Sequence, residues 1–251
     1  MNAGLSALEI INFKCISPEK GVVYLVGHID YRTESLHPVS YEVIKRAEYF
    51  ICESPNRAFN FLVRLKVNCM PDVKEFSARN LRNVIIEELL EPALSGKDIV
   101  VLSDTGLPSI GDPANIVVQK AHEYGIPVRT LPSPSPIIQF ISSMGSPYQR
   151  FFYYHYLPVS RELLKKEIGL LLKLSREMKC SIIFIESPHR TGKLLHLLIE
   201  VLPVDAFLAL GKEIGTEKEL IISRSVEWWR KNRVNVLRGE RVVMGIWLPS
   251  K

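Results

Sequence analysis

The segment at residues 98–102, Asp-Ile-Val-Val-Leu, constrains the fold most strongly, because after its first residue it is entirely apolar. An apolar run of this length is typical of a parallel strand buried on both faces. A loop rich in glycine and proline follows at residues 103–113, and residues 114–124 have helical periodicity that ends at Gly125. Strand, loop and helix in this order predict one unit of a parallel α/β sheet.

The same alternation runs along most of the chain. Strands are expected at residues 22–27, 50–52, 98–102, 126–131, 150–156, 181–185, 205–210, 217–223 and 241–248. Helices are expected at residues 40–49, 58–66, 81–95, 114–124, 134–144, 161–177, 189–202 and 225–233. Glycine, serine and proline cluster at residues 145–149, which suggests a domain boundary.

We therefore predict two α/β domains of unequal kind. An N-terminal arm at residues 1–20 shows no clear pattern, a first domain covers residues 21–147, and a second covers residues 148–251. The first domain is expected to have a parallel sheet. The second is expected to have a mixed sheet, because residues 217–223 can pair with a neighbouring strand as a hairpin.

The charge balance is mildly basic, with a net charge of +5. A basic surface suits an anionic partner such as RNA, but it is also compatible with a solvated surface that has no partner. The basic residues are densest at residues 224–241. Charge alone therefore leaves both interpretations open.

The four cysteines show no C-x-x-C pair and no zinc spacing, so no metal site is expected. Cys52 and Cys180 adjoin apolar strands and are expected to be core thiols in a reducing compartment. No apolar run approaches the roughly 18 residues of a membrane span, and the N-terminus lacks a signal pattern. A cytoplasmic protein without a membrane segment is expected.

Three loops are expected at carboxyl ends of strands, where open parallel sheets bind ligands. They are residues 103–113, 131–136 and 186–190. Each also has a purely structural explanation: helix capping by Asp112 in the first, helix initiation by proline in the second, and capping by Ser187 with a solvated Arg190 in the third. The nucleotide-binding motifs G-x-G-x-x-G and G-x-x-x-x-G-K-[ST] are absent, as is the nucleophile elbow G-x-S-x-G.

Taken in order, these loops resemble the tetrapyrrole methylase family of S-adenosylmethionine-dependent methyltransferases. The branch that methylates the cytidine 2′-O position of small-subunit (16S) ribosomal RNA typically reads S-D-A-G-T-P-x-I-S-D-P-G, and residues 103–114 follow this pattern. The typical L-P-G-P-S-A corresponds to residues 131–136, and E-S-P-H-R is unchanged at residues 186–190. R-E-L-T-K is similar to residues 212–216, and the resemblance extends from about Val22 to Leu248.

Two loops depart from that branch. Its T-P-I-G-N-L-x-D-I-T motif is barely preserved at residues 26–35, and its A-E-D-T-R has become Cys-Glu-Ser-Pro-Asn at residues 52–56. Both loops are expected to face the substrate. The departures leave open a methyltransferase for a small molecule or another macromolecule, and also a catalytically silent binding protein that has kept the cofactor fold.

The resemblance implies a homodimer of two-domain chains, with S-adenosylmethionine in the cleft between the domains and RNA of the small ribosomal subunit as substrate. The positions that match the cofactor motifs are Asp104, Thr105, Gly106, Leu107, Ile110, Ser135 and Pro136. Glu186, Lys212 and Glu213 would border the cleft from the second domain.

Methyl transfer from a sulfonium is an in-line displacement in which the enzyme positions the nucleophile, and a ribose hydroxyl also needs a proton acceptor. Glu53, Glu186 and Glu213 are the candidate acceptors, although each is equally compatible with a structural ion pair. The aromatic residues Tyr153, Tyr154, His155 and Tyr156 suit either an RNA-binding rim or a core strand.

Overall fold

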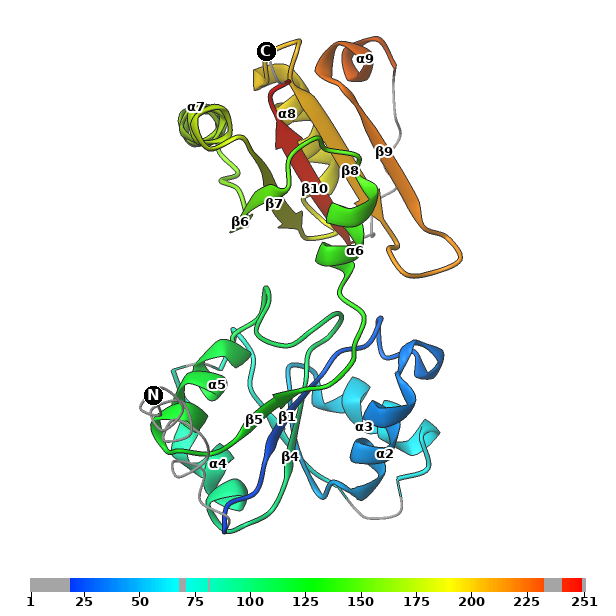
Figure 1. Cartoon of the computed structure of the whole chain (residues 1–251), viewed down its shortest axis with the longest axis vertical. Coiled ribbons are helices and arrows are strands. Elements are labelled where there is room, and N and C mark those ends of the chain that lie inside the picture. The colour runs from blue at the N-terminus through cyan, green and yellow to red at the C-terminus, as the bar shows by residue number, and fades with distance from the viewer. Residues whose placement is uncertain (1–18, 68–70, 81, 233–240, 250–251) are drawn as a thin grey trace, which may run out of the picture. The chain divides into compact units, whose positions relative to one another are not determined.

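The computed structural model describes residues 19–67, 71–80, 82–232 and 241–249. Nearly all of the expected arm, together with Cys15 and Cys69, lies outside the described residues. The chain divides into two compact units, Met1–Ser135 and Pro136–Lys251 (Figure 1). Within the described chain, no helix combines the length and the apolar character needed to cross a membrane.

The first unit is built on a five-stranded sheet in which every pairing is parallel. Its strands are β1 (Val23–Val26), β2 (Tyr49–Cys52), β3 (Asp72–Glu75), β4 (Ile99–Leu102) and β5 (Val128–Thr130), in the order β3-β2-β4-β1-β5. All four residues of β4 are buried, as its apolar sequence predicts. The expectation of a parallel sheet in this part of the chain is confirmed.

Helices cover both faces of this sheet (Figure 1). Helices α2 (Pro38–Arg46) and α3 (Pro55–Arg64) bury apolar residues against one face, which also carries Phe50 and Leu102. Helices α4 (Ile86–Leu94) and α5 (Ala114–Glu123) pack on the other face, and a single 3-10 turn, η1 (Thr33–Ser35), precedes α2. The first core is therefore two layers of apolar side chains that sandwich the parallel strands.

The second unit has a mixed five-stranded sheet. Its strands are β6 (Arg150–His155), β7 (Cys180–Glu186), β8 (Phe207–Lys212), β9 (Leu220–Ser225) and β10 (Val242–Trp247), in the order β6-β7-β10-β8-β9. Only the β6–β7 pair is parallel, and β8–β9 is the expected antiparallel hairpin. The mixed sheet inferred from the sequence is confirmed.

The two faces of the second sheet are covered unequally. Helices α7 (Arg161–Met178), α8 (Thr191–Val201) and α9 (Val226–Lys231) bury one face, whereas α6 (Pro136–Ser143) is the one helix of the described residues that packs on the other. Phe140 of α6 reaches so close to the sheet that a Cβ at Gly211 would lie 2.5 Å from its ring. Glycine is thus required in β8 at this point.

Three details differ from the expectation. The boundary of the second unit lies before Pro136 rather than after residue 147, because Phe140 and Met144 belong to the second core. The helix expected at residues 81–95 begins only at Ile86, after a turn in which the Asn83 N–H donates to the Asn80 carbonyl. Strand β3 was not expected, because its residues are mostly polar and it lies at the sheet edge.

Candidate functional site

The loops after β1 and β4 meet at the carboxyl edge of the first sheet. These two strands are neighbours, yet the chain leaves β1 toward α2 on one face and leaves β4 toward α5 on the other. The connections of two adjacent parallel strands therefore diverge at this point. Such a topological switch point opens a crevice that binds ligands in open α/β sheets.

The loop after β4 is held in a fixed shape by its own polar groups. The Ser103 hydroxyl donates to the Gly106 carbonyl over 2.9 Å, and the Asp112 carboxylate accepts from the backbone N–H groups of Ser109 and Ala114. Asp112 precedes the N-cap residue Pro113 and satisfies the Ala114 N–H at the start of α5, which is close to the capping role proposed for it from the sequence. The backbone is left-handed at Gly106, Ser109 and Gly111.

Gly27 is the point at which the loops after β1, β4 and β5 converge. Its N–H donates to the Ser133 hydroxyl over 2.8 Å. A Cβ at this position would lie 2.8 Å from the Cβ of Ser133 and 3.0 Å from the carbonyl oxygens of Gly106 and Pro134. Only glycine permits three loops to approach one another so closely.

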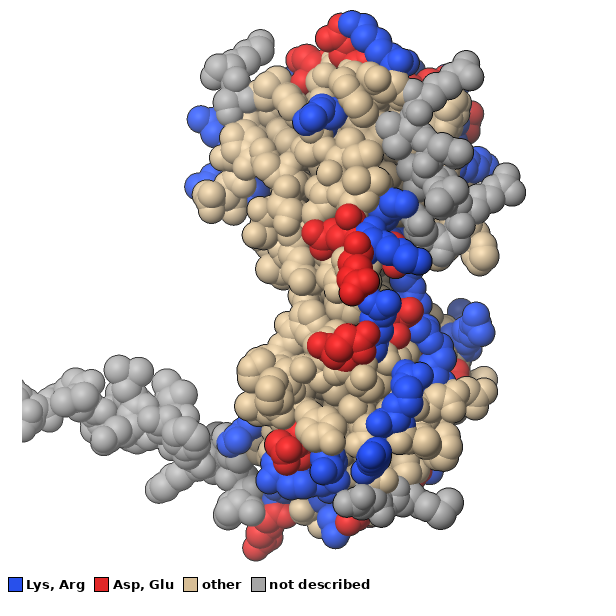
Figure 2. Space-filling view, turned by 90° about the vertical axis from the view of Figure 1, so that its right-hand side faces the viewer, with Lys and Arg blue, Asp and Glu red and all other residues tan. Residues whose placement is uncertain are grey.

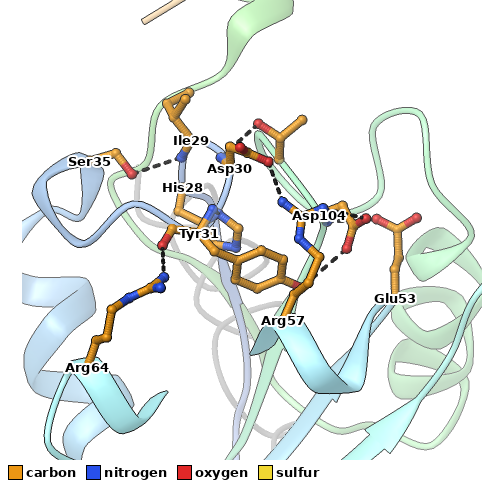
Figure 3. A network of polar contacts seen from close by, with 10 residues as sticks. His28, Ile29, Asp30, Tyr31, Ser35, Glu53, Arg57, Arg64 and Asp104 are labelled. Carbon is orange, nitrogen blue, oxygen red and sulfur yellow. Dashed lines mark hydrogen bonds and ion pairs between the residues drawn. The ribbon is translucent and has the colours of Figure 1, made fainter. Parts of the chain in front are cut away.

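Arg57, in the first turn of α3, joins the loops after β1 and β4 (Figure 3). Its guanidinium pairs with Asp104 over 3.1 Å and also with Asp30, and it lies over the ring of Tyr31 at 4.9 Å. The Tyr31 hydroxyl donates to the other oxygen of Asp104 over 3.4 Å. The Asp104 carboxylate is therefore oriented by two donors from different segments.

Glu53 supports the same loop from the end of β2. Its Oε1 accepts the backbone N–H of Asp104 over 2.8 Å (Figure 3). This contact brings two of the residues predicted from sequence, Glu53 and Asp104, into one network. The carboxylate stands beside the expected cofactor loop, which is where a proton acceptor for that site would have to lie.

The loop after β1 is anchored by the buried side chain of His28. Its Nδ1 accepts the Tyr31 N–H over 3.0 Å, and its ring packs on Tyr31 and Phe61 with centroids 4.3 and 5.1 Å away. Burial, reinforced by the positive charge of Arg57, lowers the pKa of His28 to about 4. His28 is therefore neutral at physiological pH and acts as a hydrogen-bond acceptor for the turn.

Asp30 and Tyr31 occupy a backbone region that is unusual for residues other than glycine. Their φ angles are 48° and 57°. The Asp30 N–H donates to the Thr105 hydroxyl over 3.1 Å, and Arg64 donates to the Tyr31 carbonyl over 2.7 Å. These contacts hold a left-handed turn that costs about 1–3 kcal/mol per residue, a pattern often found at functional sites.

In the second unit, Glu186 is held in a buried ion pair. Its side chain is 0% exposed and pairs with Arg190 over 3.1 Å. Its Oε1 also accepts the N–H of Ser187 over 2.7 Å. Two expectations from the sequence are wrong: Ser187 does not cap α8 with its side chain, and Arg190 is not merely solvated, because it also donates to the Leu157 carbonyl. The geometry favours the ion-pair interpretation of Glu186.

The second sheet brings the other predicted residues to one edge. Val242, the first residue of β10, pairs with Glu186 on one side and with Lys212 on the other. Glu213 follows Lys212 with a left-handed φ of 48°. The loops that follow β7 and β8 therefore leave the sheet at the same edge. There β6 also ends at His155, and Tyr156 follows it.

The remaining predicted cofactor positions lie on two loops. Thr105, Gly106, Leu107 and Ile110 belong to the loop after β4, where Gly106 is buried and the Ile110 side chain is 38% exposed. Ser135 and Pro136 stand at the junction of the two units and are half-buried. Among the described residues, no group of three or more His, Cys, Asp and Glu side chains is placed to hold a metal ion.

The loop after β4 has features that fit a bound polar cofactor. The hydroxyl of Ser109 is buried and has no hydrogen-bond partner among the described residues. Its backbone is left-handed with a φ of 74°. A buried polar atom without a partner is costly, and a ligand that hydrogen-bonds to it would remove that cost. Asp104 offers a carboxylate and Ile110 an exposed apolar side chain on the same loop.

The network contains residues that the sequence interpretation did not single out as site residues: His28, Asp30, Tyr31, Arg57 and Arg64. Residues 52–56 align with the A-E-D-T-R motif but end in asparagine, and Arg57 comes directly after them. The arginine of the motif is therefore shifted by one residue and not lost. The sequence feature that could have identified Arg57 as a site residue is its position within one turn of Glu53. The ring of His28 packs on Phe61 of α3. The residues next to His28 in the sequence do not predict this contact.

The sequence of this chain is similar to those of known proteins. The sequence model of the family "Tetrapyrrole (Corrin/Porphyrin) Methylases" matches residues 22–227. Ribosomal RNA small subunit methyltransferase I of Coprothermobacter proteolyticus is 29% identical over 72% of this chain and 80% of its own. The protein of the same name from Buchnera aphidicola subsp. Schizaphis graminum is 26% identical over 89% of this chain and 78% of its own. That of Helicobacter pylori is 32% identical over 71% and 64%.

Solved structures share the fold. Uroporphyrin-III-C-methyltransferase from Thermus thermophilus superposes with a TM-score of 0.53 at 18% identity, over 90% of this chain and 92% of its own. The methyltransferase CobJ superposes with a TM-score of 0.59 at 15% identity, over 92% of this chain and all of its own. At such identities the likeness concerns the arrangement of the strands and helices.

Proposed function

The chain belongs to the tetrapyrrole methylase family, and from this premise we propose that it is an S-adenosylmethionine-dependent methyltransferase that acts on RNA of the small ribosomal subunit. The acceptor that we propose is a cytidine 2′-hydroxyl. The main support for the proposal comes from relatives named ribosomal RNA small subunit methyltransferase I, which match most of this chain. The unchanged E-S-P-H-R segment and the loop at residues 103–113 support it.

S-adenosylmethionine would supply the electrophilic methyl group. The residues proposed to hold it are Asp104, Thr105, Gly106, Leu107, Ile110, Ser135 and Pro136. Asp104 is suited to this role because Arg57 and Tyr31 fix the direction of its carboxylate. The close packing at Gly27 makes the surrounding loops a rigid platform, which favours the alignment that in-line displacement requires.

The reacting hydroxyl must lose its proton as its oxygen attacks. Of the three candidate carboxylates, Glu53 contacts the proposed cofactor loop directly, and we place it first. Glu213 remains a second candidate at the edge of the other sheet. Glu186 is buried, with Oε1 accepting from Ser187 and Oε2 in the ion pair with Arg190, and this supports a structural role. A positioned carboxylate contributes about 10²- to 10⁴-fold to such a step.

Two further properties are part of the proposal. An enzyme that modifies ribosomal RNA works where ribosomes are assembled, so we propose a cytoplasmic location. We also propose that the chain forms a homodimer, as its family resemblance implies. Sedimentation of the purified protein at micromolar concentration would give the oligomeric state, and a monomer would contradict this part of the proposal.

The departures at residues 26–35 and 52–56 favour one second candidate, a methyltransferase with another acceptor. Calorimetric titration with S-adenosylmethionine is the first test, and absence of binding at high micromolar cofactor would contradict both candidates. Transfer of labelled methyl to small ribosomal subunits would support the RNA acceptor. Binding of the cofactor together with labelling of a different molecule in cell extract would support the second candidate.

A further inference from the structure

Helix α3 carries an exposed stripe that has no role in the core. Asn56, Phe59, Asn60 and Val63 are spaced to lie on one side of the helix, and all four are exposed. Phe59 is 48% exposed and Val63 is 60% exposed. The opposite side of α3, with Ala58, Phe61 and Leu62, supplies the buried contacts. Asn56, Phe59, Asn60 and Val63 form the α3 stripe.

The chemistry of the α3 stripe combines an aromatic ring with amide groups. Asn56 and Asn60 are exposed, and no side-chain hydrogen bond joins either of them to another described residue. The amides are therefore available to a partner, and an exposed phenyl ring offers a flat surface. Bases of single-stranded nucleic acid stack on such rings and use their polar edges for hydrogen bonds.

The charge around the α3 stripe matches a polyanion. Residues 54–71 contain no acidic residue; Arg64 and Lys66 in this stretch are exposed, whereas Arg57 is paired with Asp30 and Asp104. Arg79 and Arg82 follow β3, the strand that pairs with β2 next to α3, and both are exposed. Lys and Arg side chains gather on the side of this unit that carries α2 and α3 (Figure 2). Phosphate groups are attracted to such a surface without regard to sequence.

The α3 stripe is also continuous with the candidate site. Helix α3 begins two residues after Glu53, and Arg57 in its first turn pairs with Asp104 of the loop after β4. An RNA strand lying along α3 therefore runs directly into the network in Figure 3.

We infer that the α3 stripe is the surface that holds an unpaired segment of the RNA substrate, with one base stacked on Phe59. This inference rests on the proposed function and specifies how its substrate is recognised. Phe59 and the two asparagines contact bases, while Arg64 and Lys66 contact phosphates. Val63 supplies an apolar border to the stacked base.

The test compares Phe59→Ala with Leu170→Ala, which also removes an exposed apolar side chain from a helix; Leu170 in α7 is 56% exposed. The full chain is assayed for binding to a fluorescent unpaired RNA oligonucleotide, for cofactor binding and for methyl transfer to protein-free ribosomal RNA. Phe59→Ala should weaken oligonucleotide binding and raise KM for RNA about tenfold, in line with stacking measured by alanine substitution. Its kcat and cofactor affinity should match those of wild type and of Leu170→Ala.

A charge test runs in parallel. Replacing Lys66 by alanine should lower the slope of log affinity against log salt by about one, while Arg64, which also holds the Tyr31 carbonyl, is left unchanged. Oligonucleotide binding by Phe59→Ala at wild-type strength would overturn the inference. So would a defect seen only with intact ribosomal subunits, which would assign the α3 stripe to a protein partner.

The two proposals fail separately. If the wild-type chain methylates no RNA, the proposed function fails. The comparison of oligonucleotide binding by wild type and Phe59→Ala would then still test whether the α3 stripe binds RNA. If the wild-type chain methylates RNA and Phe59→Ala behaves like Leu170→Ala, only the inference about the α3 stripe fails.

Discussion

Arg57 and Asp104 form an ion pair of 3.1 Å that ties the first turn of α3 to the loop after β4. Asp30 from the loop after β1 binds the same guanidinium. One arginine thereby connects the start of α3 with two loops at the carboxyl edge of the first sheet. The segments that Arg57 joins are far apart in sequence. We therefore expect the loss of Arg57 to weaken binding at the proposed cofactor position more than it lowers the free energy of unfolding.

Arg57→Ala should weaken cofactor binding about tenfold, equivalent to about 1.4 kcal/mol, because Asp104 loses the donor that orients it. The free energy of unfolding should change by less than about 1 kcal/mol, since the pair is partly exposed. Calorimetry and urea unfolding measure the two quantities. Arg161→Ala, which breaks an exposed pair with Glu200, is the control and should change neither. Unaltered cofactor affinity in Arg57→Ala would contradict the orienting role.

Gly27→Ala should destabilise the chain by about 1–3 kcal/mol, because the new methyl group would be 2.8–3.0 Å from Ser133, Gly106 and Pro134. Gly169→Ala in α7 is the matched control, since a Cβ there meets no atom within 4 Å. It should stabilise the helix by about 0.5–1 kcal/mol. Urea unfolding of both variants measures the difference, and equal effects of the two substitutions would show that the loops do not pack as described.

Ser109→Ala should leave the free energy of unfolding unchanged or slightly higher, because the buried hydroxyl has no partner to lose among the described residues. If the hydroxyl binds the cofactor, the dissociation constant for S-adenosylmethionine should rise about five- to tenfold. Calorimetric titration provides the measurement. Wild-type affinity in this variant would remove Ser109 from the cofactor site, and a large loss of stability would indicate an internal partner.

Glu186→Gln should lower the free energy of unfolding by about 1–3 kcal/mol, because Arg190 keeps its charge without its buried carboxylate. Turnover under conditions that keep the chain folded should be close to that of wild type. Glu227→Gln, which removes an exposed partner of Lys231, is the control and should cost less than about 1 kcal/mol. A fall in turnover to a few per cent with a cooperative unfolding transition would instead identify Glu186 as the proton acceptor.

His28 should make folding stability depend on pH between about 4 and 6.5. Its pKa is lowered from 6.5 to about 4 in the folded chain, mainly by burial, so in this interval the unfolded chain binds a proton that the native chain does not. Stability is complete above pH 6.5 and falls as the pH drops toward 4, by about 3 kcal/mol at most.

The check is urea unfolding at pH 7 and pH 4.5 for wild type and His28→Asn. An asparagine oxygen can accept the Tyr31 N–H as Nδ1 does, and it does not titrate. The variant should therefore lose less stability between the two pH values than wild type does. An equal loss in both proteins would show that other groups cause the dependence.

The sequence predicted the local elements that rest on periodicity. The apolar Ile99–Leu102 strand, the helix after Pro113 and the hairpin of β8 and β9 all carry their signal within a few residues. The loop at residues 103–113 was identified in the same way, because its glycines and prolines are concentrated in one segment. Polar edge strand β3 was missed, since its pairing with β2 is not visible in its own composition.

What the sequence by itself determined is the class of fold and the loops proposed to form the site, because hydrophobic periodicity and turn residues act over short distances. Only the tertiary structure decided which of those side chains meet. The pairing of Arg57 with Asp30 and Asp104, the burial of His28 against Phe61 and the engagement of Glu186 by Arg190 depend on the order of strands and on helix packing. Burial and charge pairing are properties of neighbours in space, so they are fixed when the sheet is assembled.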